Sequence, residues 1–195
     1  MHRLLLCWLF CLTVVAPAWG ATPEQPVRLH SVQADFTQEK HLPILAHPLI
    51  SHGLFVFQAP GSLRWEYLEP LRSVLLMHNG AITKLVDRDG QLQPDHGTGI
   101  DAMRVILEEI GSWLDGRFTD NPLFKAIQVD SHTVMLTPRE AGLRGIINHI
   151  ELHLGQEAGI LKSVTIVEGP DSYTRLTFTN EILDATIPAQ TFVVP

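Results

Sequence analysis

Cysteine is nearly absent from this chain of 195 residues, which contains only Cys7 and Cys11. Both lie within the first 20 residues, a segment that we expect to be removed after secretion. The remaining chain would then lack cysteine, which excludes disulfide bonds, thiol catalysis and cysteine-ligated metal ions. Residues 21–195 are one domain's length of chain, so we predict a single domain that is stabilised by packing alone.

The N-terminal segment also lacks an apolar run long enough to span a membrane. Its apolar residues, 4–16, fall short of the roughly 20 that a membrane-spanning helix needs, which argues against a membrane anchor. The run follows the basic Arg3 and precedes Ala18-Trp19-Gly20. The segment therefore has the three parts of a cleavable secretory signal, and we predict cleavage after Gly20. Bulky residues precede both cysteines where a lipoprotein signal has a small one, so we expect a soluble mature protein without a lipid anchor.

Positive charge is in short supply. The chain has 14 Lys and Arg residues against 21 Asp and Glu residues. Arg3 is the only one of these charged residues within 1–20, so the predicted mature chain keeps 13 basic and 21 acidic residues, a net charge of −8 with histidine neutral. This balance argues against binding to nucleic acid and against electrostatic docking on anionic lipid.

The motifs of several common enzyme classes are missing. The chain has no Gly-x-Ser-x-Gly, no phosphate-binding glycine-rich loop and no His-Glu-x-x-His. One weak candidate metal site remains, because His149, Glu151 and His153 would share one face of a strand and are residue types that bind zinc. The alternative, which we favour, is that these three residues form the solvated face of a strand whose other face is apolar. A hydrolase or metal enzyme would rest on them alone, so we predict no enzymatic activity and no cofactor.

Two other groups of titratable residues were considered. His41, His47 and His52 surround two prolines, so they are either parts of a pH-sensitive flap or ordinary loop residues. Glu108 and Glu109 are adjacent and therefore lie on different parts of a helix surface, which makes them a poor acid and base pair. We interpret this pair as part of a solvated helix face.

Apolar residues are concentrated in two short runs, 53–58 and 63–67, with a turn between them. The pattern predicts a β-hairpin. Four consecutive apolar residues in the first run place apolar side chains on both faces, so the sheet needs a cover: a helix, a second sheet or an apolar ligand. The apolar face of the second run consists of Leu63, Trp65 and Tyr67. Its charged face consists of Arg64 and Glu66.

Turn signals divide most of the remaining chain into short extended runs. Asn79-Gly80 between two aliphatic runs is the strongest hairpin signal, whereas 91–98 is polar and rich in turn residues. Pro43 and Pro48 indicate a loop or mobile edge over 41–51. The predicted strands are 73–77, 81–87, 126–129, 133–136, 146–154, 160–167 and 172–179. The last three place an aliphatic set on one face: Ile150, Leu152, Leu154, Val164, Ile166, Leu176 and Phe178.

The segment 27–40 has apolar residues at a helical spacing. Leu29, Val32 and Phe36 are separated by three and four positions. Because the end of the segment alternates instead, we predict a helix that gives way to a strand near Val32.

A second segment, 100–110, has the pattern of an amphipathic helix that ends at Gly111. A further helical piece at Trp113 and Leu114 would follow the glycine. The apolar stripe consists of Ile100, Met103, Ile106, Leu107 and Ile110. Together, the predicted elements indicate a mainly β (α+β) domain, a single curved antiparallel sheet with helices on its open side.

Several short segments form a pattern along nearly all of the predicted mature chain. They are ADFTQ at 34–38, GLFVFQAP at 53–60, LRWEY at 63–67, the strand with Asn-Gly at 74–80, LTPR at 136–139, FTN at 178–180, and Ile187-Pro188 with Phe192. In combination they resemble the LolA family of periplasmic lipoprotein carriers. The resemblance implies an incomplete antiparallel β-barrel, or strongly curved sheet, with helices as a lid over an apolar cavity.

The resemblance also implies which residues would face an acyl chain in that cavity. Leu54 and Val56, on the opposite face, would pack against a helix behind the sheet. Carriers of this family commonly have a basic residue before the hairpin proline that latches the lid, and because Ala59 stands there, other contacts must hold it. The implied cavity residues are Phe55, Phe57, Leu63, Trp65, Tyr67, Met103, Ile106, Leu107 and Ile110.

The function implied by the resemblance is that of a non-enzymatic periplasmic carrier, expected to be a monomer. It would receive acylated lipoproteins from an inner-membrane exporter complex and deliver them to an outer-membrane receptor. Two alternatives remain: a carrier of another lipid or lipid-linked product, and a lipid-sensing regulatory protein of the same fold that binds a partner protein.

Overall fold

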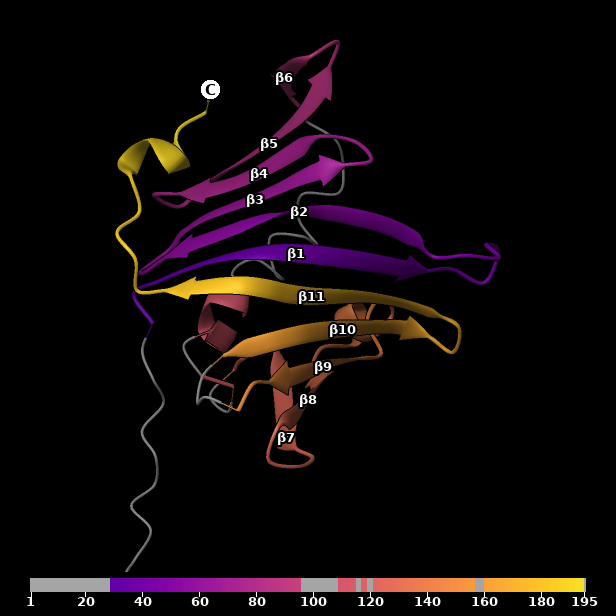
Figure 1. Cartoon of the computed structure of the whole chain (residues 1–195). Coiled ribbons are helices and arrows are strands. Elements are labelled where there is room, and N and C mark those ends of the chain that lie inside the picture. The colour runs from indigo at the N-terminus through magenta and orange to yellow at the C-terminus, as the bar shows by residue number, and fades with distance from the viewer. Residues whose placement is uncertain (1–28, 96–108, 115–116, 119–120, 157–159, 195) are drawn as a thin grey trace, which may run out of the picture.

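Strands of one antiparallel sheet dominate the computed structural model, which describes residues 29–95, 109–114, 117–118, 121–156 and 160–194 (Figure 1). The described helical elements are a segment at 109–114, α2 Ala141–Arg144 and the 3-10 helix η1 Ala189–Phe192. No helix in these ranges is long and apolar enough to cross a membrane. The eleven strands are β1 Ser31–His41, β2 Leu49–Gln58, β3 Ser62–Glu69, β4 Ser73–His78, β5 Ala81–Arg88, β6 Gln91–Pro94, β7 Phe124–Gln128, β8 Thr133–Pro138, β9 His149–Leu154, β10 Leu161–Gly169 and β11 Ser172–Leu183.

The sheet is built from two meanders that meet at its centre. Its strand order is β6-β5-β4-β3-β2-β1-β11-β10-β9-β8-β7, and each neighbouring pair is antiparallel. β6 and β7 are the two edges, so the sheet curves without closing into a barrel (Figure 1). The predicted mainly β class and unclosed curved sheet are confirmed. A helical lid is not, because most of 100–110 lies outside the described residues.

Side-chain hydrogen bonds fasten the central joint between β1 and β11. Asn180 adopts φ of 55°, a left-handed conformation that asparagine tolerates, and its Nδ2 donates to Asp35 Oδ2 at 2.6 Å. Asp184 Oδ1 accepts a hydrogen bond of 2.6 Å from the His30 backbone N–H, which holds the pKa of the Asp184 carboxyl below its ordinary value. These hydrogen bonds join β1, the first described strand, to β11, the last one.

Two tight turns connect β4, β5 and β6. Asn79 and Gly80 have φ values of 50° and 76°, and Asp89 and Gly90 have 56° and 81°. Two consecutive positive φ angles are the requirement of type I′ hairpin turns. The hairpin predicted at Asn79-Gly80 is confirmed. The expectation of an irregular segment after Gly90 is wrong in part, because β6 pairs there with β5.

At the start of 27–40 the predicted helix is wrong for the residues that the structure describes, because 29–30 are not helical and β1 begins at Ser31, whereas the predicted strand from near Val32 is confirmed. Val32, Ala34 and Phe36 alternate along β1 and are all buried. The spacing of Val32 and Phe36 fits a strand as well as a helix, and the small Ala34 between them conceals the alternation. β1 is also a central strand that pairs with both β2 and β11, a non-local arrangement that favours the extended form.

Gly111 does not end a helix, since 109–114 is helical throughout. A Cβ atom placed on Gly111 would lie 3.0 Å from Cε2 of Phe57. The glycine therefore allows close approach of the helix to the sheet, which is a different use of glycine from the predicted helix stop.

Other boundaries differ by a few residues from the predictions. The loop expected over 41–51 is confined to 42–48, between β1 and β2. Residues 146–148 lie outside β9, and neither α2 nor η1 was predicted. The described residues thus retain the predicted succession of strands with shifted ends.

Buried apolar residues lie on both faces of the sheet. We call the face that packs against 109–114 the inner face and the opposite one the outer face. The main core occupies the inner face. On the outer face Leu76, Ile187 and Phe192 form a smaller cluster with Val56 packed against it. Leu54 and Val56 were both expected to pack against a helix behind the sheet. Val56 packs against the cluster that contains Phe192 of the 3-10 helix η1, whereas Leu54 remains exposed.

Candidate functional site: the aromatic inner face

Strands β2 and β3 bring the predicted cavity residues together on the inner face. Phe55 lies opposite Trp65, and Phe57 lies opposite Leu63. All four are buried in the main core, and Tyr67 is packed against it. Because side chains alternate along a strand, this register places all five on one face.

Aromatic rings from four strands form a continuous cluster on this face. The Phe36 ring lies 4.8 Å from that of Trp65 and 5.2 Å from that of Tyr67, measured between centroids. The Phe55 ring lies 5.5 Å from Trp65 and 5.5 Å from Phe178. These distances suit tilted and edge-to-face packing of aromatic rings. Phe36 and Phe178 were missed as site residues, although both lay on predicted apolar strand faces.

Gly53 makes room for the Phe36 ring. It lies opposite Phe36 on one side and Tyr67 on the other. A Cβ atom on Gly53 would lie 2.0 Å from the Glu66 backbone oxygen and 2.6 Å from Phe36 Cζ. No ordinary side chain fits there, so the ring of Phe36 covers the position that a side chain would otherwise occupy.

The helical segment 109–114 packs on the inner face, where Leu114 lines a small cavity with Phe55 and Phe178 and the Trp113 ring lies 6.4 Å from that of Phe124 in β7. Ile110, Trp113 and Leu114 are buried, and Gly111 faces the Phe57 ring. Of the four residues predicted to line a lid, Ile110 is therefore placed in the core. The other three, Met103, Ile106 and Leu107, lie outside the described residues.

Among the described residues, a small cavity lies between the sheet and this helical segment. Its volume is about 10 Å³, and its lining residues include Phe55, Leu114 and Phe178. That volume has room for about one water molecule. An acyl chain that entered between these residues would therefore have to displace side chains that now fill the space.

Two indole N–H groups are buried in the inner core without a hydrogen-bond acceptor. They belong to Trp65 and Trp113. Burial raises the pKa of Tyr67 to about 12, with a smaller opposing effect of the nearby Trp65 N–H. The Tyr67 hydroxyl itself donates to Gln38 Oε1 at 2.8 Å. Buried donors usually have partners, so the Trp113 N–H, and the Trp65 N–H beside the Tyr67 hydroxyl, are suited to donate to the oxygen atoms of a ligand.

Polar contacts fasten the helical segment to the start of β7. Asn121 Nδ2 donates to Glu109 Oε2, and its Oδ1 accepts from the backbone N–H groups of Leu123 and Phe124 at 2.8 and 2.9 Å. Arg139 Nε donates to the Phe124 carbonyl at 3.1 Å. Glu109 is thus part of this connection, and its predicted place on a solvated helix face is corrected. Asn121 offered no recognisable signal in the sequence.

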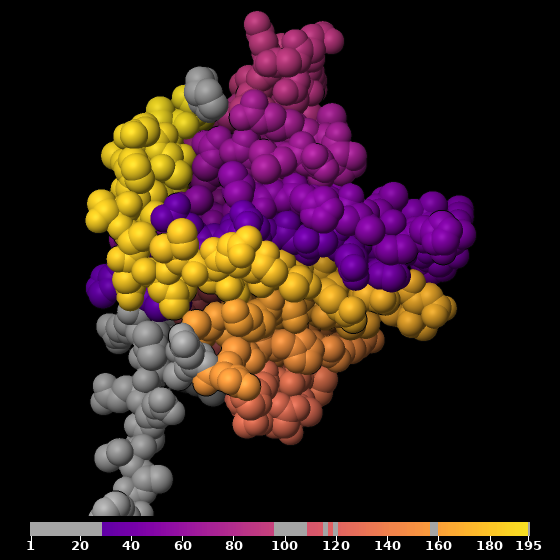
Figure 2. All heavy atoms as spheres, viewed as in Figure 1, coloured from indigo at the N-terminus to yellow at the C-terminus, as the bar shows by residue number. Residues whose placement is uncertain are grey.

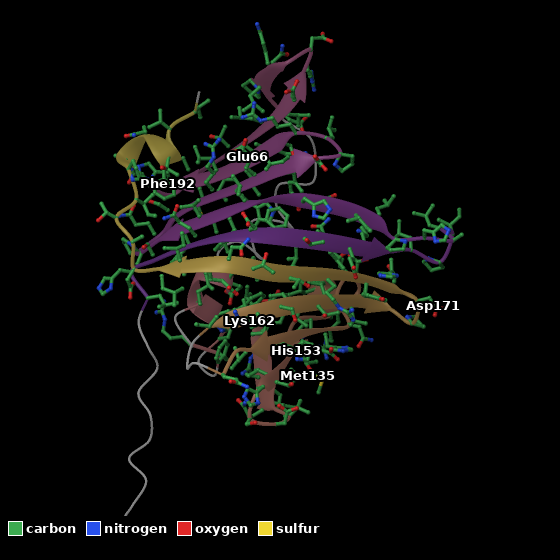
Figure 3. The ribbon with its side chains drawn as sticks, in the orientation of Figure 1. Glu66, Met135, His153, Lys162, Asp171 and Phe192 are labelled. Atoms are coloured by element: carbon green, nitrogen blue, oxygen red, sulfur yellow. The ribbon has the colours of Figure 1, made fainter. Side chains whose placement is uncertain are left out.

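Arg64 and Glu66 lie on the outer face of β3, opposite Leu63, Trp65 and Tyr67 as predicted, and this charged face is covered. Glu66 is buried and accepts hydrogen bonds from Arg64 at 2.7 Å and Arg72 at 2.9 Å. Arg64 also donates to the Thr191 carbonyl in η1 at 3.2 Å. Burial alone would raise the pKa of Glu66, but the hydrogen bonds and charges of the two arginines outweigh it and lower the pKa. Figure 3 labels Glu66 beside Phe192 of η1.

The His149, Glu151 and His153 side chains share one face of β9, as predicted, with Glu151 between the two rings. Its oxygens lie 3.3 Å from His149 Nε2 and 3.9 Å from His153 Nε2. Metal ligands lie about 2.0–2.2 Å from zinc, and within the described ranges no three such residues are arranged to hold a metal ion. These residues are partly exposed on the strand.

The three histidines around Pro43 and Pro48 have different surroundings. The His41 ring stacks on Tyr173 with centroids 4.1 Å apart, and His52 Nδ1 lies 3.1 Å from Thr37 Oγ1. His47 is exposed in the loop. A concerted pH-sensitive flap remains a prediction.

An unclosed, curved antiparallel sheet with a helical segment packed on an aromatic inner face places the chain in the class of mainly β domains with a single open sheet. More specifically, the family model of the "outer membrane lipoprotein carrier protein LolA" matches residues 28–195, and the chain belongs to this family. No curated protein matches the chain.

Several solved structures are similar to this chain at low sequence identity. A LolA superfamily protein from Nitrosomonas europaea is 11% identical, with a TM-score of 0.45 over 87% of this chain and 93% of that chain. A DUF1329 family protein from Desulfovibrio piger is 9% identical, with a TM-score of 0.46 over 85% and 90%. The MucA/MucB complex of Pseudomonas aeruginosa matches at 18% identity with a TM-score of 0.40, over 85% of this chain but only 56% of that chain.

Proposed function

We propose that this protein is a non-enzymatic periplasmic carrier of lipoproteins. It holds their acyl chains against the inner face and shuttles them from an inner-membrane exporter to an outer-membrane receptor. The observation that carries the proposal is the aromatic inner face, which is covered by the short helical segment 109–114 and contains two indole N–H groups without acceptors. Membership of the LolA family supports it.

The chemistry of the inner face suits an acyl chain attached through an ester. Burial of a methylene group contributes about 0.8 kcal/mol, so a long chain gains affinity from broad apolar contact without directed bonds. The ester carbonyl oxygens would accept hydrogen bonds from Trp65 and Trp113. Few directed bonds also permit release, which a carrier requires.

Uptake requires displacement of the helical segment because the inner face is packed. Its contact with the inner face consists of apolar side chains and the close approach of Gly111 to Phe57, whereas Glu109 accepts a hydrogen bond from Asn121, ahead of β7. An acyl chain replaces the apolar contacts of the inner face with others of the same kind.

Lipid extraction from protein purified from a Gram-negative periplasm tests the proposal. We expect mass spectrometry to find acylated lipoproteins or lipopeptides at up to one equivalent. Recovery of free lipid alone would instead support a carrier of another lipid, and recovery of no apolar compound would contradict a carrier.

A chain-length series of fluorescent fatty acids provides a quantitative companion measurement. Affinity should rise about fourfold for each added methylene until the inner face is filled. Adding the protein to spheroplasts should release newly made lipoproteins from the inner membrane. A flat chain-length series together with no release would contradict the proposed function.

A further inference from the structure

The loop between β1 and β2 and the first two residues of β2 form an exposed apolar tip, which we define as residues 42–50. Ile44 is 88% exposed, Leu49 53% and Ile50 48%. The tip projects beyond the neighbouring strand ends, at the right of Figures 1 and 2. Exposure of such a cluster to water costs free energy. We therefore interpret it as a surface that is buried against a partner when the protein functions.

The backbone of the tip presents Ile44 at its apex. Leu45 N–H donates to the Leu42 carbonyl at 3.0 Å, which forms a β-turn with Pro43 and Ile44 as its central residues. Pro43 and Pro48 lack an N–H group, so this segment is poorly suited to pair with a strand of another protein. The contact that it offers is made by side chains.

The base of the tip is fixed to the neighbouring β10–β11 hairpin. The His41 ring stacks on Tyr173, with centroids 4.1 Å apart and an interplanar angle of 15°. Lys40 Nζ lies 3.6 Å from Glu168 Oε1. These contacts brace the end of β1, so the tip stands away from the sheet, beside the turn that contains Asp171 (Figure 3).

The tip also lacks formal charge, apart from the titratable His47. Residues 42–51 contain no Asp, Glu, Lys or Arg, although the chain has 21 acidic residues. A narrow, uncharged, apolar tip suits the boundary between lipid headgroups and acyl chains, where apolar side chains are buried without a complementary groove. A protein partner would instead require a pocket shaped for the tip.

We propose that the β1–β2 tip inserts into the interfacial region of a phospholipid bilayer and docks the protein reversibly on membranes. Ile44 enters deepest, with Leu49 and Ile50 behind it. Because the driving force is apolar burial and the protein is acidic overall, binding does not depend on anionic lipid. The inference goes beyond the proposed function, since docking requires no particular cargo.

Flotation with vesicles of pure phosphatidylcholine tests the proposal. We expect the native protein to float with the vesicles, at 50 mM and at 500 mM salt alike, and Ile44→Ser to lower the partition coefficient about tenfold. Ile182→Ser is the matched control, since Ile182 is 56% exposed on β11 and outside the tip; it should float as the native protein does. Equal partition of the two variants, or no flotation of the native protein, would overturn the proposal.

The depth of insertion provides a second readout. Trp introduced as Ile44→Trp should shift its emission to shorter wavelength on vesicles and be quenched by phosphatidylcholine brominated along its acyl chains. Absence of quenching, with capture instead by a membrane protein, would replace the bilayer with a protein receptor and overturn the proposal. Uptake of a soluble fluorescent fatty acid should be unchanged in Ile44→Ser, so failure of docking is distinguishable from failure of the carrier function.

Discussion

At Gly53 the inner face has no room for a side chain. We expect Gly53→Ala to lower the free energy of unfolding by about 3 kcal/mol, and Tm by about 6–12 °C, because its Cβ would collide with the Glu66 backbone and the Phe36 ring. Thermal unfolding of purified protein measures the change. Gly61→Ala is the control: a Cβ there has no atom within 4 Å, so its Tm should remain near the native value. Equal Tm values for the two variants would contradict the prediction, because they would show that the strands beside Gly53 can move apart to accept a Cβ atom at little cost in stability.

Trp113 permits a test that separates hydrogen bonding from packing. If its N–H donates to an ester carbonyl, the native protein should bind an ester phospholipid about fivefold more tightly than the matching ether phospholipid, which lacks the carbonyl. Trp113→Phe should abolish this preference while it retains affinity for the ether lipid. Because the preference compares two lipids on the same variant, a general loss of stability does not produce it. A preference that survives in Trp113→Phe would assign the hydrogen bond to another donor.

At the scale of elements, Glu66 of β3 accepts hydrogen bonds from Arg64, which also bonds to η1, and from Arg72, which lies just before β4. Its pKa in the folded protein lies below the value of 4.5 for a free side chain. The carboxylate therefore stabilises the fold fully above that pH, and this contribution disappears as the pH falls through the lower folded-state pKa. We expect Glu66→Gln to be less stable than the native protein at pH 7 and to approach it in stability as the pH falls further and further below 4.5.

Urea unfolding at several pH values measures this convergence. Glu69→Gln provides the control, because Glu69 is an exposed carboxylate on the same strand. The difference in free energy of unfolding between Glu69→Gln and the native protein should be the same at every pH. A constant difference between Glu66→Gln and the native protein across the pH range would contradict the role of the charge.

The elements that were predicted correctly are those specified by neighbouring residues. Asn79-Gly80 determines its turn locally, and the alternation of Leu63 and Trp65 determines the face of β3. The errors arise where distant segments meet. The cover over Arg64 comes from η1, more than 120 residues later in the chain, and the role of Gly111 depends on the Phe57 ring opposite it.

At the scale of the whole molecule, family resemblance predicted the unclosed sheet and the faces of its central hairpin. It could not predict whether the interior is open, because that depends on how side chains from separate elements fill the same space. Among the described residues, the cavity between the sheet and the segment 109–114 has a volume of about 10 Å³. The site is therefore a packed core in this conformation, and a ligand must compete with the protein's own helix.

This competition predicts gated uptake. If the segment 109–114 must leave the aromatic cluster before an acyl chain enters, the observed binding rate should rise with lipid concentration and then reach a plateau set by opening. Stopped-flow mixing with a fluorescent fatty acid below its aggregation concentration measures the plateau. Gly111→Val should raise the plateau several-fold, because a larger side chain against Phe57 Cε2 disfavours the packed state. A rate that increases linearly with lipid concentration, and is the same in both proteins, would show that the acyl chain binds without displacement of the helix.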